Sequence, residues 1–261
     1  MAILVNDKQI AVTLFPDKTS QVWKLPDELL REIERDNICD VTWEFEHEGE
    51  FLQLAQLKML LDGYCDHVHL SVPYFPYARQ DKHISNTTTF ALRAFAPLLN
   101  SLGFKMTETV DFHNDRRLGL FNNLKSLPPT PFIYPVLSKL KIRTVLFPDL
   151  GAKARYNEYV VNHLQFSGSV YTASKVRDQQ TGHILGIKLP EAVMPGPLLM
   201  IDDICDGGAT FISLAFALKD RKYQGDLYLY ISHGIFSKGL QPLWDAGFKG
   251  IYTHDGEFFP A

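Results

Sequence analysis

The stretch Leu198–Phe211 joins carboxylates to a loop of small residues. It reads LLMIDDICDGGATF, an apolar run that meets Asp202 and Asp203 and continues through Asp206 into Gly, Gly, Ala and Thr. A helix-like segment follows, so the pattern predicts a strand, a small-residue loop and a helix N-terminus. Backbone N–H groups of such a loop can surround a phosphate, and the helix dipole favours the anion.

The acidic pair Asp202–Asp203 has a different task from the loop that follows it. Carboxylates repel phosphate, so the pair suits ribose hydroxyls or a divalent metal instead. Phosphate and ribose hydroxyls together describe a ribose 5-phosphate unit. The alternative is a strand edge that ends in a solvated acidic turn.

The same stretch resembles the motif that binds phosphoribosyl pyrophosphate (PRPP) in the type I phosphoribosyltransferase fold. Five further segments narrow the resemblance to ribose-phosphate diphosphokinases, also called PRPP synthetases. They follow that family's order, and the resemblance covers most of the chain from about Phe15 onward. The segments are SVPYFPYARQDK (Ser71–Lys82), TVDFHN (Thr109–Asn114), LFPDLGAKARY (Leu146–Tyr156), SKVRDQQTG (Ser174–Gly182) and SHGIFSKG (Ser232–Gly239).

Predicted strands and helices alternate along the chain, which favours mostly parallel sheets covered by helices. GSVYTASKVRD and HILGIKLP could form a ribbon. The resemblance implies an α/β protein with two phosphoribosyltransferase-like domains, each a mostly parallel sheet flanked by helices. Lys125–Pro131 (KSLPPTP) is the best linker candidate, because its prolines break helix and strand alike. We therefore expect an N-terminal ATP-site domain at residues 1–126 and a C-terminal ribose-phosphate-binding domain at residues 127–261.

The resembled family transfers the β,γ-diphosphate of ATP to the 1-hydroxyl of ribose 5-phosphate, which yields PRPP and AMP. Such a transfer must neutralise phosphate charge, align the hydroxyl and stabilise the leaving AMP. Mg²⁺ supplies much of that neutralisation and prefers oxygen ligands. Asp149 directly follows a predicted strand and is the first metal candidate. The resemblance adds His113, for which a loop histidine bonded to the backbone is the alternative.

Residues that suit a nucleotide gather just beyond one predicted strand. Arg79 and Gln80 lie among Tyr74, Phe75 and Tyr77. A guanidinium forks onto phosphate, and flat rings can stack on adenine. A surface arginine beside core aromatics is the alternative, and the whole YARQD string argues against it.

The other ATP-site candidates are Asp81, Phe15 and Asp17. Asp81 either orders Arg79 or approaches the metal, and the sequence leaves that choice open. Phe15 and Asp17 match the family's adenine-binding hairpin, Phe-x-Asp-Gly-Glu, whose glutamate is absent here. Because the resembled family uses this hairpin across a subunit interface, we expect a homo-oligomer in which two chains contact ATP.

Lys175 and Arg177 alternate along SKVRD, so both face one side of a strand or ribbon. Two cations on one face can grip the transferring diphosphate. The resembled family places its main transition-state charge stabilisers here, on a mobile loop, and a pair of solvated basic residues is the alternative. Lys153 and Arg155 either flank the loop that carries the metal candidate Asp149 or lie on a helix surface.

The phosphate loop departs from the family's pattern at Gly207. The family commonly has Asp-Thr-x-Gly-Thr, so glycine here removes a hydroxyl donor and leaves room beside the 5-phosphate. That room could admit the diphosphate of ADP-ribose, and in the plainer interpretation glycine N–H groups replace the hydroxyl. The resemblance assigns ribose-phosphate binding to Asp202, Asp203, Asp206, Gly207, Gly208, Ala209 and Thr210.

Three functions remain open at this point. The first is PRPP synthesis, the second is the same transfer to ADP-ribose to feed NAD synthesis, and the third is a non-catalytic regulatory homologue. Retention of Asp149, Lys175 and Arg177 argues against the third. A plain phosphoribosyltransferase would explain Asp202–Thr210 but neither YARQD nor SKVRD.

Composition excludes several other classes. The chain has 261 residues, is 46% hydrophobic and carries a net charge of −4, so no strong field attracts it to nucleic acid or membrane. Cys39, Cys65 and Cys205 form neither a zinc pattern nor a disulfide framework, which fits a reducing cytoplasm. No apolar run approaches membrane-spanning length, and no signal-peptide pattern is present. We expect a cytoplasmic enzyme that acts on small molecules.

Overall fold

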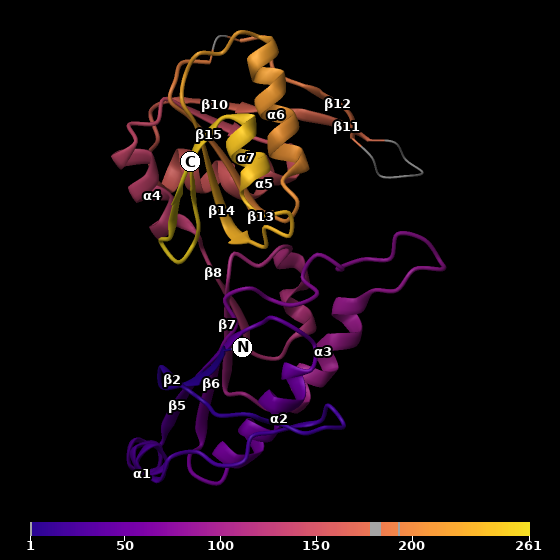
Figure 1. Cartoon of the computed structure of the whole chain (residues 1–261), viewed down its shortest axis with the longest axis vertical. Helices are drawn as coiled ribbons and strands as arrows, with labels where there is room; N and C mark the ends of the chain where they lie inside the picture. The colour runs from indigo at the N-terminus through magenta and orange to yellow at the C-terminus, as the bar shows by residue number, and fades with distance from the viewer. Residues whose placement is uncertain (1, 178–183, 193) are drawn as a thin grey trace. The chain divides into compact units, whose positions relative to one another are not determined.

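The chain divides into two compact units, Met1–Leu127 and Pro128–Ala261. The computed structural model describes residues 2–177, 184–192 and 194–261 (Figure 1). Each unit is built on one six-stranded sheet with helices packed against it.

The sheet of the first unit is mostly parallel. Its strand order is β2-β1-β5-β6-β7-β8, in which β5 to β8 run parallel and β1 and β2 are antiparallel. The strands are β1 (Ala2–Val5), β2 (Lys8–Gln9), β5 (Ile38–Glu44), β6 (His67–Ser71), β7 (Met106–Val110) and β8 (Leu124–Leu127). The other elements are the hairpin β3 (Thr13–Leu14) and β4 (Ser20–Gln21), helices α1 (Asp27–Asp36), α2 (Glu50–Leu61) and α3 (Ala91–Ser101), and the 3₁₀ helix η1 (Asp115–Leu120).

An aromatic cluster around Phe75 organises the core of this unit. The Phe75 ring lies edge-on to Phe112 and Phe121, with ring centroids 5.2 and 5.0 Å away, and to Phe95 of α3 at 6.1 Å. Such edge-to-face pairs contribute about 0.5–1.5 kcal/mol each beyond burial. Phe75 follows β6 and Phe112 follows β7. The loops that carry the candidate ATP and metal residues of this unit are therefore anchored in one core.

The sheet of the second unit has the order β10-β9-β13-β14-β15-β16, parallel except for β16. Its strands are β9 (Thr144–Phe147), β10 (Ser169–Thr172), β13 (Leu198–Cys205), β14 (Leu227–Gly234), β15 (Phe248–Tyr252) and β16 (Phe258–Pro260). Its helices are α4 (Thr130–Lys139), α5 (Leu150–Glu158), α6 (Ala209–Asp220) and α7 (Gln241–Ala246), with a π-helical turn η2 (Tyr159–His163) after α5.

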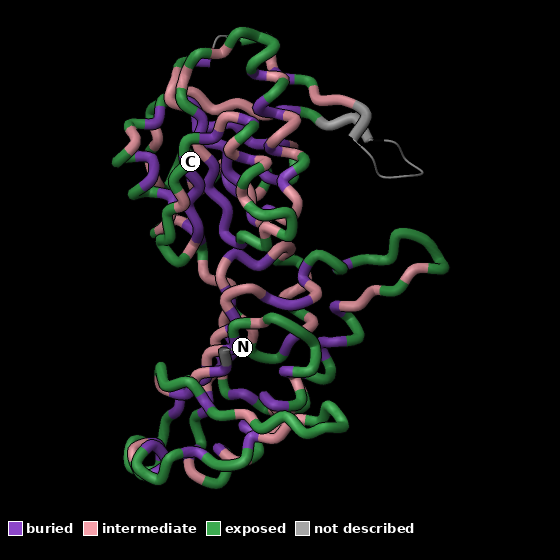
Figure 2. Tube along the Cα trace, viewed as in Figure 1, coloured by how far each residue is buried: buried purple, intermediate pink, exposed green. Residues whose placement is uncertain are grey.

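Strand β13 is largely buried (Figure 2), and its side chains divide between two cores. Leu198 and Met200 pack with residues of α6 and α7, whereas Leu199 and Ile201 pack with residues of α4 and α5. Successive side chains of a strand point to opposite faces, so helices on both faces bury the whole apolar run. This explains why the strand is continuously hydrophobic up to Asp202.

A separate ribbon, β11 (Ser174–Arg177) with β12 (Ile184–Lys188), leaves the second unit as an antiparallel pair. Its register shifts between Val176 and Arg177. The sequence pattern predicts that residues of β10 belong to this ribbon, but β10 instead pairs with β9 as an edge strand of the sheet.

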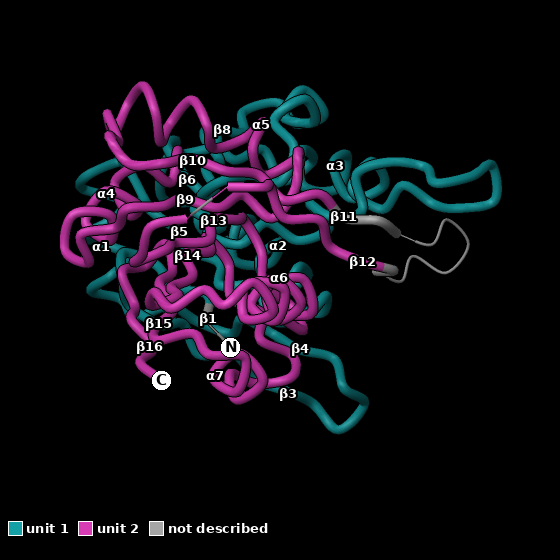
Figure 3. Tube along the Cα trace, turned by 90° about the horizontal axis from the view of Figure 1, so that it is seen from above, with its two compact units in different colours: residues 1–127 teal, residues 128–261 magenta. Residues whose placement is uncertain are grey.

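The expected fold class is confirmed, because both sheets are mostly parallel and flanked by helices. The boundary between the two units lies between Leu127 and Pro128 (Figure 3), inside the segment Lys125–Pro131. Most of that segment is not an irregular linker, because β8 continues to Leu127 and α4 begins at Thr130. Within the described residues, no helix is long and apolar enough to cross a membrane.

The three cysteines should be unreactive in the folded protein. Burial raises the pKa of Cys39 and of Cys205 to about 12 and also raises the pKa of Cys65. Because the thiolate is the reactive form, Ellman's reagent at pH 8 should label native protein far more slowly than urea-unfolded protein. Rapid labelling of one thiol per native chain would contradict this burial.

Candidate functional site

The loop from β13 to α6 is shaped by two glycines with different roles. Gly208 precedes α6 and has a φ of +73°, a backbone conformation that residues with a Cβ rarely adopt. A Cβ at this position would also lie 3.1 Å from Cδ2 of Leu243 in α7. Gly207 has no positive φ, and the side-chain stem of Lys238 lies beside it. The loop thus directs the start of α6 toward the end of β13, the arrangement that suits a phosphate.

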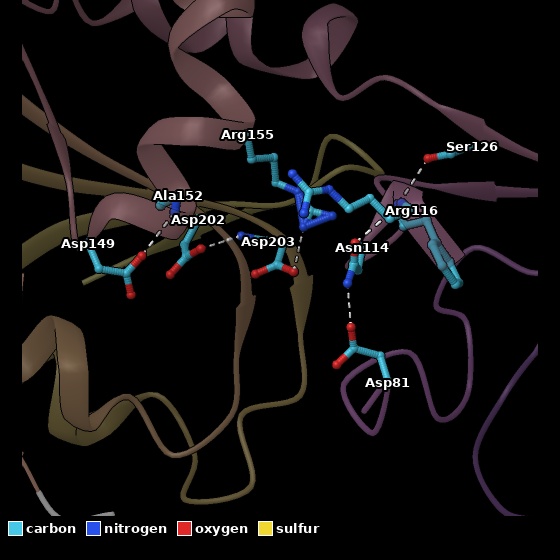
Figure 4. Close-up of polar contacts among 10 residues, drawn as sticks. Asp81, Asn114, Arg116, Ser126, Asp149, Ala152, Arg155, Asp202 and Asp203 are labelled. Atoms are coloured by element: carbon cyan, nitrogen blue, oxygen red, sulfur yellow. Dashed lines mark hydrogen bonds and ion pairs between the residues drawn. The ribbon is translucent and has the colours of Figure 1, made fainter. Parts of the chain in front are cut away.

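Asp202 and Asp203 lie inside β13, which continues to Cys205, and the two carboxylates have different contacts (Figure 4). Asp203 is buried, and its Oδ2 accepts a hydrogen bond from Nη1 of Arg155 at 3.1 Å. The backbone N–H of Asp203 donates to Oδ1 of Asp202 at 3.0 Å. Asp202 is more exposed than Asp203. The two carboxylates therefore differ, one locked in an ion pair and the other nearer to solvent.

Arg155 belongs to this site rather than to a helix surface. The sequence left its position open. In the structure, the Arg155 side chain reaches from α5 to Asp203, and the exposed fractions of the two side chains are 16% for Arg155 and 9% for Asp203. Lys153, two residues earlier, is exposed. Burial strengthens a charge-assisted hydrogen bond but requires that both charges stay paired.

Asp149 begins α5 two residues after β9. Its Oδ1 accepts a hydrogen bond from the N–H of Ala152 at 2.9 Å, which makes Asp149 the N-cap of the helix. β9 and β13 are parallel neighbours, so Asp149 and Asp202 lie at the same edge of the sheet (Figure 4). Asp149 therefore has a structural task beside any part in metal binding.

The donor chemistry at this edge fits Mg²⁺. Within the described residues, no group of three His, Cys, Asp or Glu side chains converges as a metal cage. Mg²⁺ usually takes one or two carboxylates and completes its shell with water and substrate phosphates, so a full protein cage is not required. Asp149 and Asp202 supply such carboxylates, whereas His113 of the first unit offers a nitrogen that Mg²⁺ rarely chooses.

In the first unit, the loop after β6 presents Arg79 and Gln80 to solvent. Tyr77 has a φ of +62°, an unusual conformation for a residue with a side chain. Its hydroxyl donates to Oε1 of Glu48 at 2.7 Å, and burial together with this carboxylate raises the pKa of Tyr77 to about 12. The N–H of Leu92 donates to the carbonyl of Gln80, which ties the loop to the start of α3.

Asp81 joins this loop to the segment that carries His113 (Figure 4). The buried Asp81 carboxylate accepts a hydrogen bond from Nδ2 of Asn114, and Nε of Arg117 lies 3.8 Å from it. The Arg117 guanidinium also lies over the Phe90 ring, 5.2 Å from its centroid. Asp81 therefore holds two loops together, and one of these loops carries Arg79.

Asn114 and Arg117 were missed by the sequence analysis as site residues. Asn114 caps η1, since its Oδ1 accepts from the N–H of Arg116 at 3.3 Å. The N–H of Phe112 donates to Oγ of Ser126 at 3.0 Å. His113, half-buried, is thus held between two anchored neighbours. Asn114 followed by Asp115 at the start of η1 is a recognisable N-cap signal, but nothing in the sequence linked it to Asp81.

The hairpin residues Phe15 and Asp17 have different surroundings. Phe15 lines a cavity of about 840 Å³ together with Gln21, Trp23 and Met59. Asp17 lies in the hairpin turn, where its Oδ1 accepts from the N–H and Oγ1 of Thr19. Hydrogen bonds to the Thr19 hydroxyl and N–H lower the pKa of Asp17. Asp17 is thus part of the turn that shapes the hairpin.

The predicted catalytic cations lie on β11, of which the structure describes the backbone. Lys175 pairs in register with Ile187, and Arg177 with Ile184. Their side chains, like residues 178–182 of the SKVRDQQTG segment, fall outside the described part of the chain.

Sequence comparison finds curated relatives of one name, although no protein-family model matches the chain. The ribose-phosphate pyrophosphokinase of Mesorhizobium japonicum is 27% identical over 195 residues, which cover 71% of this chain and 61% of the relative. That of Haemophilus influenzae is 29% identical over 175 residues, which cover 64% of this chain and 53% of the relative. The match therefore spans between half and two thirds of the length of these relatives.

Structural comparison agrees on the fold. The crystal structure of phosphoribosylpyrophosphate synthetase from Mycobacterium smegmatis matches with a TM-score of 0.68 and 20% identity, covering 81% of this chain and 70% of that chain. In sequence the protein is therefore similar to ribose-phosphate pyrophosphokinases, and its α/β fold is that of the phosphoribosylpyrophosphate synthetase.

Proposed function

We propose that the protein transfers the β,γ-diphosphate of ATP to the 1-hydroxyl of an acceptor that contains ribose 5-phosphate, with release of AMP. The observation that carries this proposal is the edge formed by β9 and β13, where Asp149, the acidic pair and the small-residue loop meet. The names of the curated relatives support the same reaction. For ribose 5-phosphate itself, the product is PRPP.

Different residues of the second unit bind different parts of the acceptor. The loop from Asp206 to Thr210 and the start of α6 receive the phosphate, because their N–H groups and the helix dipole favour an anion. Asp202 accepts hydrogen bonds from ribose hydroxyls. Asp203 and Arg155 form the support behind it, and their ion pair keeps the end of β13 and α5 in a constant arrangement.

The residues of the first unit receive ATP. Arg79 and Gln80 are exposed and suit phosphate oxygens, and the loop that carries them is tied down through Asp81. Phe15 and Asp17 of the hairpin extend this site. In a homo-oligomer, the hairpin of one chain contacts the ATP that is bound to a neighbouring chain. Lys175 and Arg177 stabilise the charge that develops on the transferring diphosphate.

Asp149 would hold Mg²⁺ in the second unit, with His113 as the candidate of the first. When bound, the ion neutralises phosphate oxygens and lowers the cost of bringing two anionic substrates together.

ADP-ribose is a second candidate acceptor, which Gly207 favours because a threonine side chain is absent there. A non-catalytic regulator would bind nucleotide without releasing AMP. A mass-spectrometric assay for AMP and the diphosphorylated acceptor distinguishes such a regulator from the proposed enzyme.

The ribbon cations should matter most in the transition state. Lys175→Ala and Arg177→Ala are each expected to lower kcat by roughly 10²-fold or more, with a much smaller change in KM for ATP. Lys188→Ala, an exposed lysine at the far end of the same ribbon, is the matched control and should keep wild-type turnover. Near-normal kcat in both single variants would remove SKVRD from the active site.

Two substitutions of Asp149 distinguish the role of its negative charge from its role as the N-cap of α5. Asp149→Asn keeps a good N-cap and removes the carboxylate, so it should abolish most Mg²⁺-dependent activity while Tm stays close to wild type. Asp149→Ala should lose activity and, in addition, about 1 kcal/mol of stability through loss of the cap. An active Asp149→Asn enzyme, or full wild-type activity in EDTA, would refute the metal role.

Asp81 should act on ATP binding through the two loops that it joins. Asp81→Ala removes the acceptor of Asn114 and the charge facing Arg117, and should raise KM for ATP by roughly tenfold or more through misplacement of Arg79. Asp115→Asn removes an exposed carboxylate from the same segment and serves as the control. Equal KM values for Asp81→Ala and wild type would show that the link is purely structural.

A further inference from the structure

The loop that follows β14 packs against the phosphate loop of the same unit. The N–H groups of Ile235 and Phe236 both donate to the carbonyl of Cys205, at 2.9 and 3.2 Å. Cys205 ends β13 immediately before the phosphate loop. These two hydrogen bonds bring Lys238, two residues further on, to the side of Gly207.

The side-chain stem of Lys238 occupies the space that a residue other than glycine would need at position 207. A Cβ built on Gly207 would lie 3.3 Å from Cε, 3.4 Å from Cδ and 3.7 Å from Cγ of Lys238. Gly207 has no positive φ, so its backbone does not by itself require glycine. The room that the sequence analysis expected beside the phosphate is therefore partly filled, and a lysine fills it.

The position of this lysine adds a cation to an anion-binding loop. Its ammonium lies one bond beyond Cε, the stem atom nearest to a Cβ built on Gly207, and Lys238 is exposed. Within the described residues, the Lys238 side chain forms no ion pair or hydrogen bond. The acidic residue nearest in sequence to Gly207 is Asp206, which directly precedes it. A flexible ammonium without a fixed partner can move toward a phosphate without breaking another contact.

The loop and Lys238 serve different parts of a phosphate chain. Backbone N–H groups at the start of α6 are short-range donors that surround one phosphate closely. A flexible ammonium on an exposed side chain beside the loop can meet negative charge that continues outward from that phosphate. A 5-monophosphate ends inside the loop, whereas a 5-diphosphate ester carries a second charged group to the edge.

We propose that Lys238 is a specificity-determining residue that favours acceptors with a diphosphate at the ribose 5-position over ribose 5-phosphate. The inference rests on the proposed function, because it assumes that the loop from Asp206 to Thr210 binds the acceptor phosphate. Gly207 has a matching part, since its lack of a side chain lets the lysine stem lie across the loop.

The test is calorimetric titration of the full chain with ribose 5-phosphate and with ADP-ribose, while α,β-methylene-ATP and Mg²⁺ keep the ATP site filled. Lys238→Met keeps the stem and removes the charge. It should weaken ADP-ribose binding by roughly tenfold or more, as expected for loss of a charge-assisted hydrogen bond, and ribose 5-phosphate binding by less than about threefold. Lys249→Met, an exposed lysine on β15, should change neither affinity.

A second variant separates the position of the lysine from its charge. Gly207→Ala keeps the ammonium but displaces the stem, so it should lower the ratio of the two affinities in the same direction as Lys238→Met, by a smaller factor. The inference is overturned if Lys238→Met leaves that ratio unchanged, whether both affinities fall together or neither falls.

Failure of the proposed function gives a different result. Wild-type protein that binds neither ribose 5-phosphate nor ADP-ribose would overturn both the acceptor site and the role of Lys238. Wild-type protein that binds both acceptors, with a ratio that is insensitive to Lys238→Met, would overturn the role of Lys238 alone.

Discussion

The parallel pairing of β13 with β9 on one side and β14 on the other is the constraint on which the second unit depends. Parallel neighbours end at the same edge of a sheet, so the loops that follow them meet there although they are far apart in sequence. Asp149, the phosphate loop and Lys238 follow these three strands in turn. β13 sends alternate side chains into two cores, and a slip of one residue would exchange them, so packing also fixes the geometry of the site.

A buried carboxylate organises the candidate site in each unit. Asp203 pairs with Arg155 of α5, and Asp81 bonds Asn114 and faces Arg117. A buried charge is costly unless it is paired and hydrogen-bonded, and removal of one partner typically costs about 3–5 kcal/mol when both are buried. Each pair links two chain segments that local structure alone would leave independent. These acids are therefore supports for neighbouring residues that remain open to solvent, namely Asp202 in one unit and Arg79 in the other.

Two adjacent glycines show that one residue type can meet two physical demands. Gly208 is required by its positive φ and by the close approach of Leu243. Gly207 has an ordinary backbone, and its neighbour is a flexible lysine stem that could shift by a few tenths of an ångström. Substitution at 208 would strain the loop itself, whereas substitution at 207 would mainly displace the lysine.

The sequence alone predicted the architecture and proposed the residues of the candidate site. Alternating apolar strands and amphipathic helices predicted mostly parallel sheets, and the Asp-Asp pair before small residues predicted the loop at the end of β13, because both signals are local. Tertiary structure decided which of these polar groups are partners. The Arg155–Asp203 pair spans 48 positions and the Asn114–Asp81 bond spans 33, and Lys238 reaches Gly207 from the loop that follows β14. Such contacts depend on strand order and on burial, which bring distant residues together and which no local pattern of side chains records.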